Sequence, residues 1–132
     1  DLMGSGIETV SHLRQNGRIT VMFCAFAGAP RIIRLYGRGR VIQRGDSEFG
    51  AMVEFFAPGP DLQVVLRSVI VIDVTRIADS CGFVVPRMDF VEERQQLFEW
   101  GHMLGDRRDA YIAKFNTASI DGLQGLDAPI SR

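Results

Sequence analysis

The 132-residue chain has few of the side chains that most often build metal sites or nucleophilic sites. It contains two cysteines and two histidines. Cys24 and Cys81 form no CxxC motif, and His12 and His102 belong to no HxH or HExxH motif. There is also no GxSxG nucleophile motif. We therefore expect no metal site, no identifiable catalytic side chain, and reduced thiols in a cytoplasmic protein.

Long apolar runs and an excess of charge of one sign are missing as well. The longest apolar stretches, at residues 19–29 and 69–74, are shorter than the roughly 20 residues that a membrane-spanning helix needs. Fifteen basic and 16 acidic residues give a formal net charge of -1. Proteins that bind nucleic acid commonly carry a basic surface. The composition thus argues against a membrane or a nucleic acid as a partner.

A short helix is expected near the start of the chain. Ser5 and Glu8 have the S-x-x-E spacing of a capping box, and apolar residues recur at helical spacing over residues 6–15. Asn16-Gly17 is typical of a helix end, because glycine adopts the left-handed conformation easily. The chain therefore predicts a helix that follows a turn of small residues.

This turn is a candidate phosphate site. The first N–H groups of a helix are unpaired and carry a positive partial charge, so Gly4-Ser5-Gly6 before the helix can bind a phosphate. The hydroxyls of Ser5 and Thr9 would add donors. The alternative is that Ser5 only caps the helix and Thr9 faces solvent.

Two strands should follow as an antiparallel hairpin. Residues 18–27 are rich in β-branched and aromatic residues, and residues 31–43 alternate between apolar and polar side chains. Arginines gather along the second strand, and several guanidinium groups on one face suit phosphate or carboxylate recognition. The alternative is a charged solvent face or a set of ion pairs across a dimer, and we favour this alternative for Arg38 and Arg40. The arginines of this strand are Arg31, Arg34, Arg38 and Arg40.

The remaining chain predicts further helices around a strand-rich core. We expect one domain over residues 1–132, mainly β with peripheral helices and thus of the α+β class, in which 1–87 form the core and 88–132 a helical extension. A ferredoxin-like α+β domain is the alternative. The further elements expected are a helix from Gly45-Asp46 to Pro58, a strand over 68–76, a short strand over 83–86, helices from the capping-box pattern Asp89-x-x-Glu92 onward and over 106–116, and a surface-bound tail from Asn116 to Leu126.

The order of these motifs resembles the pyridoxamine 5'-phosphate oxidase family of flavoproteins. A small-residue turn and helix come first, followed by NGRITVMFCAF, a turn and PRIIRLYGRGRVI, over about residues 1–44. The later segments VIVIDVTRIADSCGF and MDFVEER, and the NxxSIDGLxGL tail, resemble an actinobacterial-type, and hence bacterial, subgroup.

The resemblance implies an FMN-binding split β-barrel whose N-terminal strands are absent. Residues 1–87 would be the barrel core, and two copies would form a homodimer with FMN at the interface. The implied phosphate ligands are Gly4, Ser5 and Thr9, and Arg31 and Arg34 would lie beside the cofactor. The family commonly places Arg and Lys at the start of this helix, where this chain has residues 7–9 without a basic group. Glu8 would repel a phosphate unless it completes the capping box.

The implied activity is that of an FMN-dependent oxidoreductase with a small-molecule substrate that the sequence does not identify. The chain lacks the Trp-Gly-rich strand, with its following Arg and His groups, that forms the oxidase's substrate site, so vitamin B6 oxidation is not expected. One alternative is a non-catalytic module that binds a flavin, the deazaflavin F420 or haem. Another is a structural homodimer without a cofactor, which the missing basic pair favours.

Overall fold

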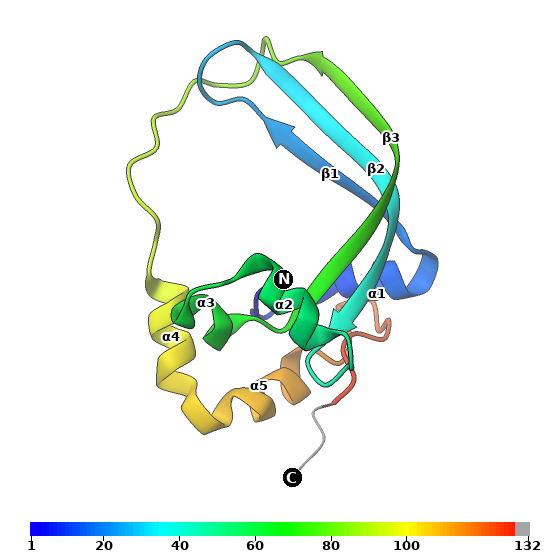
Figure 1. Ribbon diagram of the computed structural model, residues 1–132, viewed down its shortest axis with the longest axis vertical. Helices are drawn as coiled ribbons and strands as arrows, with labels where there is room; N and C mark the ends of the chain where they lie inside the picture. Colours follow the sequence, from blue (N-terminus) through cyan, green and yellow to red (C-terminus); the bar gives the residue numbers. More distant parts are fainter. Residues whose placement is uncertain (129–132) are drawn as a thin grey trace.

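The computed structural model describes residues 1–128 and combines one antiparallel sheet with several helices (Figure 1). The α+β class is therefore confirmed. In chain order the elements are α1 (Glu8–Asn16), β1 (Arg18–Cys24), β2 (Arg31–Gln43), α2 (Phe49–Phe56), α3 (Pro60–Val65), β3 (Ser68–Cys81), α4 (Gln96–Leu104), the 3-10 turn η1 (Gly105–Arg107) and α5 (Arg108–Phe115).

The expected hairpin forms the first two strands of the sheet, whose order is β1-β2-β3. β2 has the expected bounds, because its alternating pattern lets one face pack while the other meets solvent. β1 ends at Cys24 rather than at residue 27, since the chain turns between the strands through Gly28 with a φ of 71°. In the hairpin register Arg18 lies opposite Arg38.

β3 is longer than expected and runs to Cys81 instead of ending near residue 76. Its last residues pair with the start of β2, where Cys81 lies opposite Arg31. This pairing provides hydrogen-bond partners for backbone groups of residues 77–81, which would lack them if β3 ended near residue 76. The long strand therefore reflects its neighbour in the sheet more than its own sequence.

The segment between β3 and α4 contains neither of the two elements expected there. Residues 82–95 include no strand at 83–86 and no helix starting near Asp89; α4 begins only at Gln96. Both expectations were wrong. In Figure 1 this segment runs as a long connection from the end of the sheet to the helices at the opposite end. Few contacts hold it there, because most of its side chains are exposed.

The core lies at one end of the sheet, where α1, α5 and the last described residues meet. Ile7 and Val10 of the α1 region contact Ile112 of α5 and Leu126, and Val41 of β2 packs against this cluster. α1 approaches the sheet closely at Gly39, where a Cβ atom would lie 2.7 Å from the Leu13 side chain. A glycine at this position thus lets the helix pack directly on β2.

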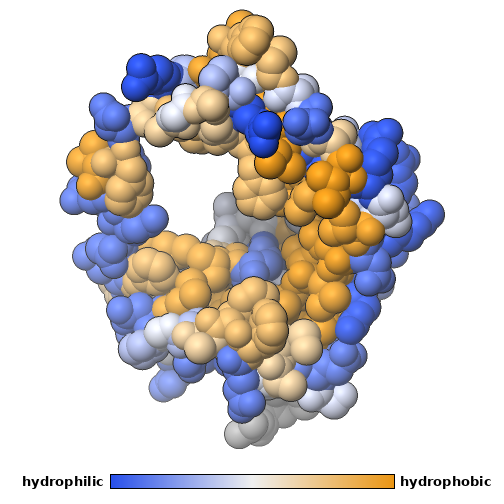
Figure 2. Space-filling view, turned by 45° about the horizontal axis from the view of Figure 1, so that its top comes forward, coloured by the Kyte–Doolittle hydropathy of each residue, from blue (hydrophilic) through white to orange (hydrophobic). Residues whose placement is uncertain are grey.

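The other end of the sheet leaves much apolar surface uncovered. Phe23 of β1 is 56% exposed and Ile77 of β3 is 68% exposed. Figure 2 shows apolar residues gathered around an opening between the sheet, the helices and the long connection. Apolar surface of this extent is typical of a face that another molecule covers. Further exposed apolar side chains in this part of the chain are Met22, Phe26, Val74, Phe83, Val84, Met88, Phe90 and Val91.

Candidate functional site

The turn of Gly4, Ser5 and Gly6 leads directly into α1, as the sequence indicates. The side chains of Ser5 and Thr9 are exposed. The backbone N–H groups of Thr9 and Val10 find no acceptor among residues 1–128. The start of α1 therefore offers the two hydroxyls and the backbone N–H of Thr9 to an anion, with the positive partial charge of a helix N-terminus behind them, whereas Val10 is only 1% exposed.

The capping box expected here does not form. Ile7 occupies the N-cap position and α1 has no side-chain cap hydrogen bond. The Glu8 carboxylate instead accepts a hydrogen bond from the backbone N–H of Ile120, with 3.3 Å between N and Oε1. Gly6 leaves room for this arrangement, because a Cβ atom there would lie 2.7 Å from Glu8 Oε2. A contact between residues far apart in the chain thus replaces the local cap.

Backbone amides hold the Glu8 carboxylate in its ionised form. Hydrogen bonds from its own backbone amide, and then from those of Ile120 and Ile7, lower the pKa of Glu8, and the nearby charge of Arg67 acts in the same direction. The carboxylate is therefore tied to the protein surface by N–H groups that favour the charged form. The negative charge of Glu8 is thus stabilised by these backbone amides.

The tail expected on the surface in fact supports the turn. Asn116 is completely buried, and its side-chain Nδ2 donates a hydrogen bond to the Gly4 carbonyl oxygen at 2.8 Å. Its backbone carbonyl accepts from Leu126 N–H at 2.8 Å. The tail also accepts a bond at the Leu123 carbonyl from the Ser11 hydroxyl of α1, at 3.4 Å. The tail therefore fixes the position of the turn relative to α1.

A buried arginine that the sequence analysis missed lies on the other side of the turn. Arg67 is 7% exposed, and its Nη1 donates to the Gly6 carbonyl oxygen at 2.8 Å. Its Nε also donates to the Asp1 carboxylate at 2.8 Å. Burial lowers the pKa of Arg67, yet an arginine stays protonated. One signal for it existed in the sequence, a single charged residue between apolar Leu66 and Val69.

The structure does not bring Arg31 and Arg34 to this turn within one chain. They lie near the start of β2, whereas Val41, near its end, packs against the core cluster at α1. Ten residues of extended strand span roughly 30 Å, so Arg31 lies far from the turn. The two arginines also project from opposite faces: Arg34 donates to the Ser80 hydroxyl at 3.1 Å, and Arg31 lies 3.9 Å from Asp79. The expected same-face group was wrong for Arg31.

Arg38 and Arg40 make contacts within the chain. Arg40 pairs with Glu48 at 2.8 Å, and this hydrogen-bonded carboxylate raises the pKa of the arginine. Arg38 donates to the Asn16 carbonyl oxygen at the end of α1, at 3.0 Å. Both groups are exposed, so an ordinary structural role accounts for Arg40 in particular.

The part of the chain that the structure describes holds neither a metal-ion cluster nor a membrane-spanning helix. No three His, Cys, Asp or Glu side chains of residues 1–128 come together in an arrangement that would hold a metal ion. No helix among these residues combines the length and the apolar character that crossing a membrane requires.

The network around Glu8 predicts a pH dependence of stability. Because its pKa is lowered from the ordinary value of 4.5 on folding, ionised Glu8 stabilises the fold above that pH, and this contribution is lost as the pH falls through the lowered pKa. Glu8→Gln keeps an acceptor oxygen but removes the charge. We expect the variant to be less stable than the wild type at neutral pH, with the difference shrinking as the pH falls below 4.5.

Urea unfolding at a series of pH values measures this difference. A matched control is Glu99→Gln, which changes an exposed glutamate in the first turn of α4. A difference between wild type and Glu8→Gln that stays constant down to the lowest pH would contradict the role assigned to the carboxylate.

Comparison with known proteins gives one significant relative. The chain is 37% identical over 140 aligned positions to the pyridoxamine 5'-phosphate oxidase family protein ustO of the fungus Aspergillus flavus. The alignment covers 96% of this chain and 55% of that protein, so the chain spans about half the length of the curated relative it matches. No protein-family model matches the chain. No solved structure is significantly similar to it.

Proposed function

Since this chain belongs to the pyridoxamine 5'-phosphate oxidase family, we propose that it binds FMN, with the cofactor phosphate at the turn before α1. The observation that carries the proposal is the set of free donors at the helix start: the hydroxyls of Ser5 and Thr9 and the N–H group of Thr9. A phosphate monoester accepts such hydrogen bonds well, because each bond is strengthened by its charge.

The surroundings of the turn fit a phosphate. A Cβ atom at Gly4 would meet nothing within 4 Å, so the turn is open on that side. The Arg67 guanidinium behind Gly6 holds the Gly6 carbonyl in place, and its charge balances that of the Asp1 carboxylate. The Glu8 carboxylate is tied to the Ile120 amide, which keeps one of its oxygens from facing a ligand. The turn can thus hold an anion without the basic pair that the family commonly has at this helix.

A homodimer of the split-barrel type is part of the proposal. The uncovered apolar end of the sheet supports it, since a second copy would cover exposed residues such as Phe23 and Ile77. Arg31 and Arg34 lie at this same end. In such a dimer they would lie beside the cofactor held by the partner subunit, which would explain why one chain keeps them apart from its own turn.

The activity proposed for the whole protein is an oxidoreduction. When bound, FMN would supply the redox chemistry, and this chain's own residues would hold the phosphate and keep water away from the flavin. The substrate-site signature of the vitamin B6 oxidase is lacking in this sequence, so a different small molecule is proposed as substrate. F420, haem, and a structural dimer without a cofactor remain the alternatives that the experiment separates.

Flavin retention tests the proposed site. We expect purified protein mixed with FMN to keep the flavin absorbance bands between about 300 and 550 nm through gel filtration and to elute as a dimer. Ser5→Ala and Thr9→Ala each remove one charge-assisted hydrogen bond, so each should weaken FMN binding about tenfold, the effect of losing about 1.5 kcal/mol. Titration of FMN fluorescence measures the affinity.

Ser47→Ala is the matched control, because it removes an exposed hydroxyl in the turn after β2, away from α1. It should bind FMN like the wild type. Wild-type protein that stays colourless and does not respond to FMN would overturn the proposal and favour the structural dimer. Binding of F420 or haem in place of FMN would keep a cofactor site but change its occupant.

A further inference from the structure

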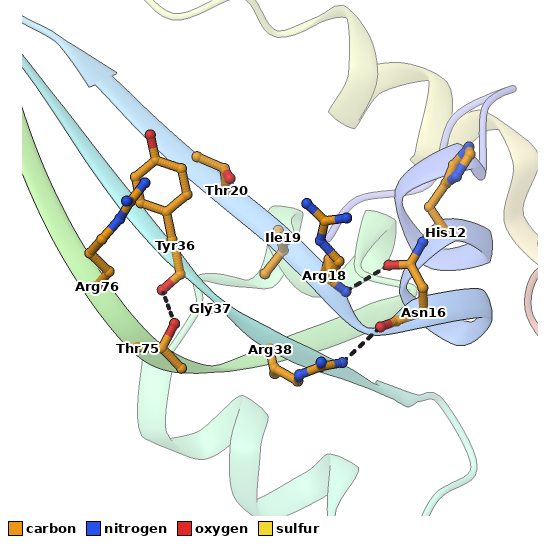
Figure 3. A pocket seen from close by; sticks show the side chains of 10 residues that line it. All are labelled: His12, Asn16, Arg18, Ile19, Thr20, Tyr36, Gly37, Arg38, Thr75 and Arg76. Atoms are coloured by element: carbon orange, nitrogen blue, oxygen red, sulfur yellow. Dashed lines mark hydrogen bonds between the residues drawn. The ribbon is translucent and has the colours of Figure 1, made fainter.

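An open cleft lies at the end of α1 away from the turn, on the surface of the three strands (Figure 3). Its volume is about 640 Å³. α1 supplies its last residues to the cleft, and each of the three strands supplies at least two residues. The lining residues are His12, Asn16, Arg18, Ile19, Thr20, Tyr36, Gly37, Arg38, Thr75 and Arg76.

The lining of this cleft is strongly positive. It includes three arginines, Arg18, Arg38 and Arg76, and it includes no Asp or Glu. The acid closest in the sheet register is Asp73, which lies opposite Arg38 on β3. Asp73 does not line the cleft and forms no ion pair with Arg38 among the described residues. The three guanidinium charges are therefore not neutralised by acids in the cleft wall.

Two of the arginines keep most of their donors free. The side chain of Arg18 makes no hydrogen bond or ion pair within residues 1–128, although its backbone N–H donates to Asn16 Oδ1. The Arg76 guanidinium lies over the Tyr36 ring, 4.1 Å from its centroid, and this stacking uses none of its N–H groups. Figure 3 shows Arg18 and Arg76 on either side of Thr20, with Tyr36 beside Arg76.

The cleft is separate from the turn that holds the proposed flavin phosphate. α1 has nine residues, and the turn precedes its first residue whereas Asn16, its last, lines the cleft. At a rise of about 1.5 Å per residue, the two ends of this helix lie roughly 13 Å apart. Neither Ser5 nor Thr9 lines the cleft. One phosphate group cannot occupy both places.

We propose that this cleft is a second anion site, which binds the phosphate or pyrophosphate group of a small organic molecule. Arg18 and Arg76 supply planar pairs of N–H donors, the arrangement that matches phosphate oxygens. The hydroxyl of Thr20 adds a donor between them, and the edge of the Tyr36 ring offers an apolar surface to the organic part. The site binds its anion whether or not the flavin site is filled.

Titration calorimetry with inorganic pyrophosphate at low ionic strength tests the proposal. One pyrophosphate should bind each chain at the cleft, in addition to any that binds at the turn before α1. Arg18→Gln and Arg76→Gln should each weaken binding about tenfold, because each removes charge-assisted hydrogen bonds worth about 1.5 kcal/mol. Arg40→Gln is the matched control: Arg40 also lies on the sheet, is paired with Glu48, and does not line the cleft, so affinity should not change.

Ser5→Ala and Thr9→Ala separate this site from the flavin site. They should leave pyrophosphate affinity at the cleft unchanged even if FMN does not bind the protein at all. Wild-type affinity in both Arg18→Gln and Arg76→Gln, loss of pyrophosphate binding in Ser5→Ala, or no binding to the wild type would each overturn the proposal. If either arginine variant fails to fold, as judged by circular dichroism, chemical shift changes of Tyr36 and His12 in the titrated wild type decide: shifts support the site and their absence overturns it.

Discussion

Replacing Arg67 by methionine should lower the free energy of unfolding by about 3 kcal/mol, the low end of the cost of breaking a buried ion pair. The substitution keeps an apolar stem of similar length but removes every donor. The Asp1 carboxylate, also mostly buried, then loses its bonds from Arg67 Nε and Nη2 at 2.8 and 3.2 Å. The Gly6 carbonyl loses its donor as well. Urea unfolding followed by circular dichroism measures the loss.

The same variant should bind FMN more weakly, because Gly6 is no longer held in place. Arg40→Met is the matched control. Its ion pair with Glu48 is exposed, and exposed pairs contribute at most about 1 kcal/mol. If Arg67→Met and Arg40→Met were equally stable, the buried network around Asp1 would not stabilise the turn as inferred.

The second large effect is expected for Gly125→Ala, with a loss of about 2 to 3 kcal/mol, the upper part of the range for an overpacked core. A Cβ atom at Gly125 would overlap the backbone oxygen of Asn116 and lie 2.9 Å from the Ile7 side chain. The backbone has little freedom to move away, because Gly125 N–H donates to Thr117 and the next N–H donates to Asn116, both at 2.8 Å. Thermal unfolding measures the loss.

The displaced Asn116 would also release the Gly4 carbonyl, so Gly125→Ala should weaken FMN binding together with stability. Gly50→Ala is the matched control. It lies in α2 with nothing within 4 Å of its Cβ position, and alanine stabilises a helix relative to glycine by up to about 1 kcal/mol. A Gly125→Ala protein as stable as Gly50→Ala would show that the tail does not pack tightly on Asn116.

Sequence patterns gave the local elements of the fold where one face of an element is clearly apolar. The bounds of β2 and the end of α1 at Gly17, whose φ is 68°, agree with the structure. The turn of Gly4 and Ser5 before α1 was also placed correctly. In these segments the residues that determine the structure lie close together in the sequence. The spacing of apolar residues and the local composition are therefore enough to predict the element.

The sequence-based predictions were wrong where residues far apart in the chain determine the local structure. Glu8 had the spacing of a cap, yet its carboxylate accepts a bond from Ile120, 112 residues away. β3 continues past its turn signals because β2 pairs with it. Arg67 carried no local sign of its three acceptors, which come from Asp1 and Gly6. Patterns in a single sequence contain no information about such distant partners. The contacts that hold the turn before α1 in place are almost all of this long-range kind.

The bond between Gly4 and Asn116 has a consequence for the order in which the site can form during synthesis. Their positions differ by 112 in the sequence, so a ribosome makes the turn long before it makes the residue that holds it. Closing a loop of this length costs conformational entropy that only the finished contacts offset. A nascent chain can therefore form the β1–β2 hairpin early, whereas the turn before α1 becomes rigid only after the tail has left the exit tunnel.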